Sequence, residues 1–68
     1  MTIFSDVGRK IKTTRAVRKI TQEDLAELID MDVRSVIAIE SGDRNPTLKT
    51  IYKICKALKV RSSELLGF

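Results

Sequence analysis

The stretch TQEDLAELIDMDVRSVIAIESG, residues 21–42, decides the fold of this chain. Thr21 is followed by acidic residues, and a threonine hydroxyl that accepts a backbone N–H two or three residues later begins a helix. Asp32 is a favourable N-cap after the tight turn Asp30-Met31-Asp32, and Gly42 suits a helix end. The stretch therefore predicts two short helices joined by a turn of about three residues, which is a helix-turn-helix unit. The expected helices cover residues 21–29 and 32–41.

Apolar residues at helical spacing extend this pattern on both sides of the stretch. The expected inward positions are Phe4, Val7, Ile11, Leu25, Ala26, Ile29, Val36, Ile39, Leu48, Ile51, Ile54, Cys55 and Leu58. Thr47 is the expected cap of a fourth helix, and a short last helix over residues 62–66 is expected between a Ser62 cap and Gly67. No segment alternates polar and apolar residues for long enough to form a strand. The sequence predicts an all-α fold of five short helices.

The chain has 68 residues, no histidine and one cysteine. A core of this size buries only about 60% of the surface that the unfolded chain exposes, so we expect one domain, residues 1–68, stabilised by helix packing with or without oligomerisation. One cysteine provides neither an internal disulfide nor a zinc cluster, and Cys55 is expected to be a small buried side chain. Because no apolar run has membrane-spanning length, we expect a cytoplasmic protein. Because the sequence has no cluster of metal ligands, we expect no metal, and we expect no cofactor.

The net charge of +4 is unevenly distributed along the chain. Residues 8–19 contain basic side chains and no acid. The charged residues of 21–43 are seven acids and Arg34, and the chain becomes basic again from Arg44. Basic segments on either side of an acidic centre are typical of a protein that grips a polyanion at its edges. Solvated lysine faces produce the same pattern, so charge alone leaves nucleic acid and a plain charged surface both open.

Several short motifs carry a resemblance to a known family. They are TQEDLA at 21–26, IESG at 39–42, NPTL at 45–48, ALKV at 57–60 and ELL at 64–66. Together they resemble the phage repressor/Cro type helix-turn-helix (XRE) family over residues 8–66. In size the chain is similar to stand-alone members such as the controller proteins of restriction–modification systems. The resemblance implies a lambda-repressor-like domain that binds double-stranded DNA and regulates transcription.

The resemblance also implies roles for particular residues. Those expected to face base edges are Val33, Arg34, Ile37 and Ala38, flanked by Asp32 and Ser35. Those expected at DNA phosphates are Gln22, Ser35, Arg44 and Asn45, to which the first basic segment adds Arg18. Arg15 and Glu40 match a pair that forms an internal salt bridge in some phage repressors, and a structural role suits Glu40 because an acid near DNA repels phosphate.

Some of these residues also fit a simpler interpretation. Arg34 is the only cation of the acidic stretch, and its guanidinium suits bidentate pairing with guanine, but it also fits a solvated surface position. Val33 and Ala38 fit contact with a thymine methyl or neutral exposed positions. Ile37 fits either a base contact or the core, and Gln22 fits a capping role alone.

The sequence departs from the family pattern at several positions. Lys19 stands where a helix-ending glycine is frequent, Thr14 replaces a usual leucine, and Leu28 replaces a usual polar residue. Arg61 occupies a position where a capping serine is frequent, and Val33 replaces an often polar base-reading residue. These differences are compatible with the fold, but they prevent the target DNA sequence from being inferred by analogy.

Two functions of different class remain open. The first is a transcription factor that binds an inverted repeat as a homodimer through Tyr52, Leu66 and Phe68. The second is an antitoxin or other protein-interaction module of the same fold, which apolar surface at Leu28, Tyr52 and Phe68 would suit. The basic segments and Arg34 favour the first. An enzyme is not expected, because the sequence offers no pairing of a nucleophile with a base and no cluster of metal ligands.

Overall fold

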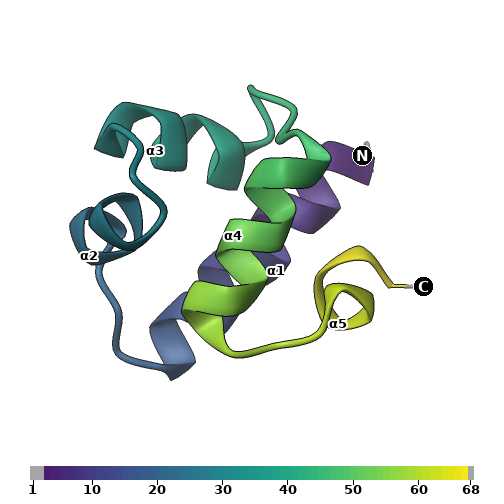
Figure 1. The fold of residues 1–68 in the computed structure, drawn as a ribbon. Coiled ribbons are helices and arrows are strands. Elements are labelled where there is room, and N and C mark those ends of the chain that lie inside the picture. Colours follow the sequence, from purple (N-terminus) through teal and green to yellow (C-terminus); the bar gives the residue numbers. More distant parts are fainter. Residues whose placement is uncertain (1–2, 68) are drawn as a thin grey trace.

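The computed structural model describes the backbone of residues 3–67 and the side chains of residues 5–67. This part of the chain forms five helices and no strand (Figure 1). The helices are α1 (Ile3–Val17), α2 (Gln22–Leu28), α3 (Val33–Ser41), α4 (Leu48–Leu58) and α5 (Ser62–Leu66). The predicted all-α fold of five short helices is confirmed.

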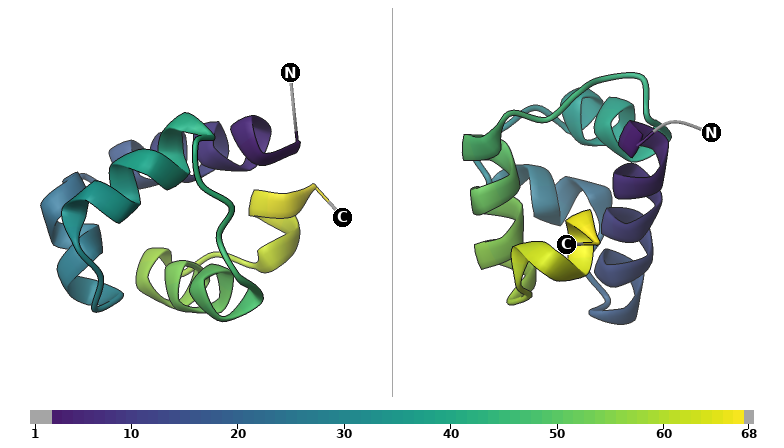
Figure 2. Two further views of the ribbon diagram at one scale, coloured as in Figure 1. Left: turned by 90° about the horizontal axis from the view of Figure 1, so that it is seen from above. Right: turned by 90° about the vertical axis from the view of Figure 1, so that its right-hand side faces the viewer.

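The helices enclose one core. Figure 2 shows α1 and α4 on opposite sides of it, with α3 across the top and α5 closing the side that carries the C-terminus. The side chains with the least exposure come from all five helices and from the residue after α2; they are Ile11, Leu25, Ile29, Val36, Ile39, Ile54, Leu58 and Leu65. The inward positions predicted on α2 and α3 are therefore confirmed. Phe4 lies on α1, but its side chain is outside those that the structure describes.

Local capping explains where α2, α3 and α4 begin. The Thr21 hydroxyl accepts the N–H of Asp24 at 3.0 Å, and the Asp24 carboxylate accepts the N–H of Thr21 at 3.1 Å, which is a complete capping box. Asp32 accepts the N–H of Arg34 at 2.8 Å, and Thr47 accepts the N–H of Thr50 at 3.1 Å. The three predicted N-caps are therefore confirmed.

The ends of four helices use a left-handed backbone, at Lys19 after α1, Gly42 after α3, Lys59 after α4 and Gly67 after α5. Gly42 ends α3 at φ 84°, as predicted, and Lys19 adopts φ 58° after α1. Only glycine reaches this region without steric cost, so Lys19 holds the turn that a glycine would form more easily. At this departure from the family pattern, Lys19 therefore adopts a conformation that is usual for a helix-ending glycine.

Two sequence-based expectations were wrong. Ser62 is the first residue of α5 and not its cap; Arg61 is the N-cap residue and makes no side-chain capping hydrogen bond. Leu48 is 83% exposed, although helical spacing placed it inward. The first buried residue of α4 is Ile51, so the core ends before it reaches the first turn of this helix. Periodicity identifies a face of a helix but not how far along that face the core extends.

Nowhere in residues 3–67 is there a helix with both the length and the apolar character needed to span a membrane. The same part of the chain contains no group of three or more His, Cys, Asp or Glu side chains placed to hold a metal ion.

Candidate nucleic-acid interface

The helix-turn-helix unit consists of α2, a tight turn and α3. The turn contains Asp30 in the left-handed region at φ 56°, and the N–H of Met31 donates to the carbonyl of Ala26 at 2.9 Å. Val36 and Ile39 pack into the core and so hold α3 against it; each has 2% of its surface exposed. Because a helix that buries one side presents the opposite side to solvent, α3 offers a continuous outer face for a ligand.

The predicted base-reading residues divide into two pairs on α3. Arg34 and Ile37 lie on the outer face, and Ile37 is 47% exposed, so it belongs to the surface and not to the core. Val33 and Ala38 are half-buried at its edges, and Val33 packs against the core. Arg34 and Ile37 are therefore the side chains of this set that protrude.

The loop after α3 is held against that helix. The backbone N–H groups of Asp43 and Arg44 both donate to the Ala38 carbonyl, at 2.9 and 3.2 Å. The guanidinium of Arg44 also donates to the Ser35 hydroxyl at 2.6 Å. The fold thus brings together Ser35 and Arg44, two residues predicted at phosphates, and Asn45 follows them exposed on the same loop.

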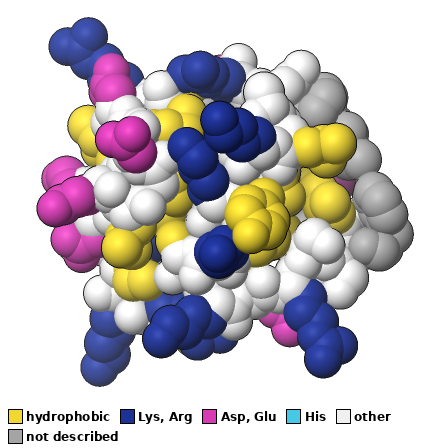
Figure 3. Space-filling view, in the orientation of Figure 1, with side chains coloured by type: hydrophobic (Ala, Val, Ile, Leu, Met, Phe, Trp, Pro, Cys, Tyr) yellow, Lys and Arg dark blue, Asp and Glu magenta, His cyan; other side chains and the backbone are white. Residues whose placement is uncertain are grey.

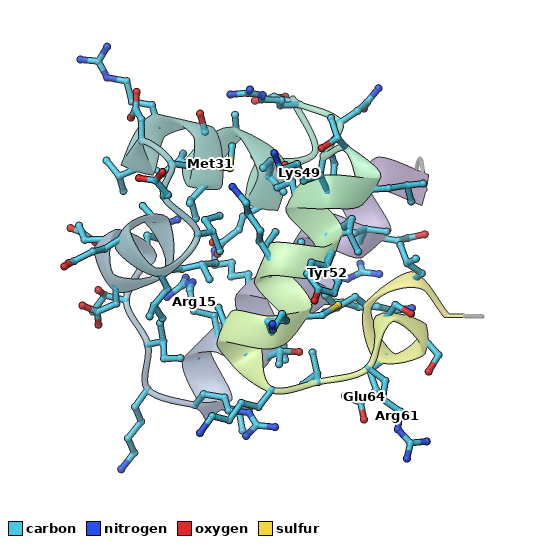
Figure 4. All side chains as sticks on the ribbon, in the orientation of Figure 1. Arg15, Met31, Lys49, Tyr52, Arg61 and Glu64 are labelled. Carbon is cyan, nitrogen blue, oxygen red and sulfur yellow. The ribbon has the colours of Figure 1, made fainter. Side chains whose placement is uncertain are left out.

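Arg15 and Glu40 form a bidentate ion pair between α1 and α3. Arg15 Nε donates to Glu40 Oε2 at 2.7 Å, and Arg15 Nη2 donates to Glu40 Oε1 at 3.2 Å. The side chain of Glu40 is only 2% exposed and that of Arg15 is 12% exposed. Arg15 Nη1 donates to the Ile20 carbonyl at 2.7 Å, so the same guanidinium also holds the segment before α2 (Figure 4).

Gln22 belongs to this network as well. Its Nε2 donates to Glu40 Oε1 at 3.0 Å, and its side chain is half-buried. Among the described residues, no buried side-chain nitrogen or oxygen lacks a hydrogen-bond partner. The buried polar side-chain atoms beneath the outer face of α3 therefore all have hydrogen-bond partners, as low-dielectric surroundings require.

Lys12 also lies at this surface; the sequence placed it among the basic residues 8–19, of which one or two were expected at phosphates and the rest solvated. A hollow of about 150 Å³ is lined by Lys12, Gln22, Ile37, Glu40 and Ser41, which come from α1, α2 and α3. Lys12 lies three residues before Arg15 on α1, and this spacing puts both on one side of the helix. That spacing was the signal available from the sequence.

Arg18 is not brought to this surface. It follows α1, and its guanidinium lies 3.5 Å from the carbonyl oxygen of Lys59, the residue that ends α4. In Figure 1 this end of α1 lies at the bottom of the molecule and α3 at the top. The expected phosphate contact of Arg18 therefore has no support from its position.

A different face, formed by α4, carries apolar side chains among lysines. Figure 3 shows this face with its exposed hydrophobic side chains surrounded by basic ones, and Figure 4 labels Tyr52 on it. The ammonium of Lys56 lies 5.3 Å from the centre of the Tyr52 ring. A hollow of about 530 Å³ on one side of Tyr52 includes Leu48 and Leu66, with Cys55 on its lining.

Two predicted dimer residues, Tyr52 and Leu66, therefore line the same hollow, whereas Phe68 lies outside the described residues. The exposed Leu48 is a further member of this surface that helical periodicity had placed in the core. Burial raises the pKa of the Cys55 thiol, and the negative charge of Glu64 adds to the effect. Cys55 consequently stays protonated and unreactive at neutral pH.

Comparisons with known proteins agree with this geometry. The helix-turn-helix family matches residues 11–65. An uncharacterized HTH-type transcriptional regulator of Methanocaldococcus jannaschii is 39% identical over 56 residues, covering 82% of this chain and 85% of its own. The control protein C.BamHI of Bacillus amyloliquefaciens is 39% identical over 62 residues, covering 90% and 76%. The crystal structure of the restriction–modification controller protein C.AhdI from Aeromonas hydrophila superposes with a TM-score of 0.88 at 32% identity, covering 91% of this chain and 94% of that one.

This chain belongs to the helix-turn-helix family, in its XRE type, and is a transcriptional regulator with a DNA-binding fold. Within that family it is similar to controller proteins of restriction–modification systems, as its motifs predicted. The family is regulatory and not enzymatic.

Proposed function

We propose that the protein binds a specific sequence of double-stranded DNA, with α3 in the major groove, and acts there as a homodimer on an inverted repeat. The outer face of α3 carries this proposal, because it presents Arg34 and Ile37, with Lys12 on the same hollow as Ile37 and Arg44 bonded to Ser35 of the same helix. An α-helix fits the major groove in diameter, and flanking cations neutralise phosphates on either side of it.

The proposed contacts follow from these positions. Arg34 reads a guanine, Ile37 touches a thymine methyl, and Val33 and Ala38 approach the same bases from the edges of the helix. Phosphates are held by Gln22, Ser35, Arg44, Asn45 and Lys12. The hydrogen bond from Arg44 to Ser35 restricts the guanidinium, so less side-chain entropy is lost when it meets a phosphate.

Arg34→Ala is expected to weaken binding to the specific site by about 1–3 kcal/mol and to relax base preference at one position in each half-site. Arg44→Ala is the matched control, because it removes a guanidinium from outside the helix. It should weaken specific and random DNA alike and reduce the salt slope by about one unit. The measurement is a titration of a duplex selected from a random pool, and of its scrambled version, at several salt concentrations. Equal losses on both duplexes for Arg34→Ala would make it a phosphate contact only.

The hollow on α4 supports the proposed homodimer. Leu48, Tyr52 and Leu66 place apolar surface on one side of α4, and a two-fold contact buries the same patch of both subunits. Such a dimer presents two copies of α3, about 34 Å apart when they read successive turns of one face of DNA.

Leu48→Glu is expected to convert the dimer to monomers, because the new charge would be buried at the contact. Val17→Glu is the control, since Val17 is also exposed but lies on α1 outside this hollow. Sedimentation velocity at micromolar concentration measures the effect, and circular dichroism checks that both variants are folded. A wild-type protein that sediments as a monomer with and without DNA would rule the dimer out.

A protein-interaction module is the second candidate, and one observation favours it. Leu28 is 59% exposed and lines a hollow of about 440 Å³ between α2 and α4, together with Tyr52 and Lys53. An exposed apolar hollow of this kind suits a protein partner. A gel-shift experiment with random duplex at low salt separates the two candidates, because a module that has lost DNA binding leaves the duplex unshifted.

A further inference from the structure

The hydrogen bond between Gln22 and Glu40 connects a proposed DNA contact to a buried ion pair. Gln22 is the first residue of α2, and its Nε2 donates to Glu40 Oε1 at 3.0 Å. Arg15 donates to both carboxylate oxygens of Glu40, and it also donates to the carbonyl of Ile20, two residues before Gln22. One guanidinium therefore holds both the acceptor of Gln22 and the segment that leads into α2.

Glu40 is too deeply buried to touch DNA itself. Its side chain is 2% exposed, and the positive charge of Arg15 compensates its negative charge. Gln22, in contrast, is half-buried and lines the hollow whose other walls include Lys12 and Ile37. Of the two side chains that donate to Glu40, Gln22 is therefore the one that also lines a surface hollow where DNA could reach it.

The chemistry of the bond defines how the Gln22 amide lies. A carboxylate accepts hydrogen bonds and cannot donate, so it selects the amide nitrogen and repels the amide oxygen. The flipped amide, with Oε1 against Glu40, is excluded. The nitrogen carries two hydrogens that diverge in direction, and Glu40 uses one of them, which leaves the second for another acceptor.

We propose that Glu40 is a positioning residue for DNA binding: it orients the Gln22 amide so that its second N–H meets a DNA phosphate. This inference rests on the proposed DNA-binding function. A glutamine held in one rotamer loses less conformational freedom on binding than a free one, and the excluded flip would turn an oxygen toward the phosphate.

A matched pair of double variants tests the proposal. Arg15→Leu with Glu40→Gln removes the ion pair but keeps an amide oxygen that accepts from Gln22, whereas Arg15→Leu with Glu40→Leu removes the acceptor as well. Removing both charges together avoids leaving one of them buried without a partner. Gln22→Ala is made alone and is also added to each double variant, which completes a mutant cycle between residues 22 and 40.

The probe is a fluorescent 20-base-pair duplex of random sequence at low salt, because a phosphate contact does not depend on the operator. Gln22→Ala should weaken binding about fivefold, as expected for one hydrogen bond to phosphate. The Arg15→Leu, Glu40→Leu variant should also bind about fivefold more weakly than the wild type. Adding Gln22→Ala to that variant should cause no further loss of affinity. The Arg15→Leu, Glu40→Gln variant should bind more tightly than the Arg15→Leu, Glu40→Leu variant but less tightly than the wild type, because an amide at position 40 can accept from Gln22 but can also donate to it and so selects its orientation less strictly. It should lose affinity when Gln22→Ala is added. All affinities are expressed per folded molecule, from circular dichroism.

Equal affinity of the two double variants would overturn the proposal. NMR of the wild-type protein provides a measurement that needs no variant: the side-chain amide protons of Gln22 should be separated from those of solvated glutamines and slow to exchange. Random-coil values for these protons would also overturn it. A wild-type protein that binds no duplex would instead overturn the proposed function, so the two failures are distinguishable.

Discussion

Glu40→Ala is expected to lower the free energy of unfolding by about 3 kcal/mol, because it leaves the guanidinium of Arg15 buried without its counter-ion. Both side chains lie largely inside the protein, and the carboxylate accepts two hydrogen bonds from Arg15 and one from Gln22. Removing one partner of such a pair lowers the free energy of unfolding by more than the intact pair adds to it. The reason is that the desolvation penalty of the remaining charge is no longer offset by an opposite charge. Urea unfolding followed by circular dichroism measures the change.

Glu27→Ala is the matched control for that experiment. Glu27 is an exposed acid on α2, so its removal should change the free energy of unfolding by less than about 0.5 kcal/mol. If Glu40→Ala were as mild as the control, the ion pair would be without structural importance and the junction of α1, α2 and α3 would have to be held by apolar packing alone.

Gly8→Ala is expected to destabilise the fold by about 3 kcal/mol, at the upper end of the range for overpacking. A Cβ at Gly8 would lie 2.6 Å from the carbonyl oxygen of Glu40 and would also clash with the carbonyl oxygen of Ile39. Both atoms belong to the backbone of α3, so no side chain can rotate away to make room. The helix α3, which carries the proposed base contacts, would have to move relative to α1.

Helix propensity predicts the opposite sign for the same substitution. Alanine is favoured over glycine by about 1 kcal/mol in the middle of a helix. Ala16→Gly, at an exposed position of α1, measures that propensity term without any close contact. Thermal and urea unfolding of both variants decide between the two effects: a Gly8→Ala protein more stable than the wild type would show that α1 and α3 do not approach as closely as the structure indicates.

The caps of α2, α3 and α4 were predictable from the sequence because each depends on a hydrogen bond between residues two or three positions apart. Thr21 and Asp24 complete their capping box whatever the rest of the chain does. The buried faces of α2 and α3 were predictable for a related reason, since the helical repeat alone brings Leu25 and Ile29, or Val36 and Ile39, to one side. These signals sufficed for the number of helices and their order.

The candidate site was predictable only in part. Arg34 was proposed because the resemblance places it among the base-facing residues and because it is the only cation of residues 21–43, and the structure exposes it on α3. The Gln22–Glu40 bond was missed, and Lys12 could not be separated from the other cations of residues 8–19, because both depend on how α1 and α2 pack against α3. Arg18 was placed at the interface by charge alone, and charge carries no information about the end of the helix at which a residue emerges.

Sequence by itself determined the all-α class, the helix-turn-helix unit at residues 21–42 and the inward faces of α1 to α4, because all of these depend on near neighbours along the chain. Tertiary structure alone decided that Leu48 is exposed and that Gly8 must lack a side chain. It also decided that Arg15, Gln22 and Glu40 share one network. The physical reason is that these features join residues that are distant in sequence, and only the packing of complete helices sets the distance between them.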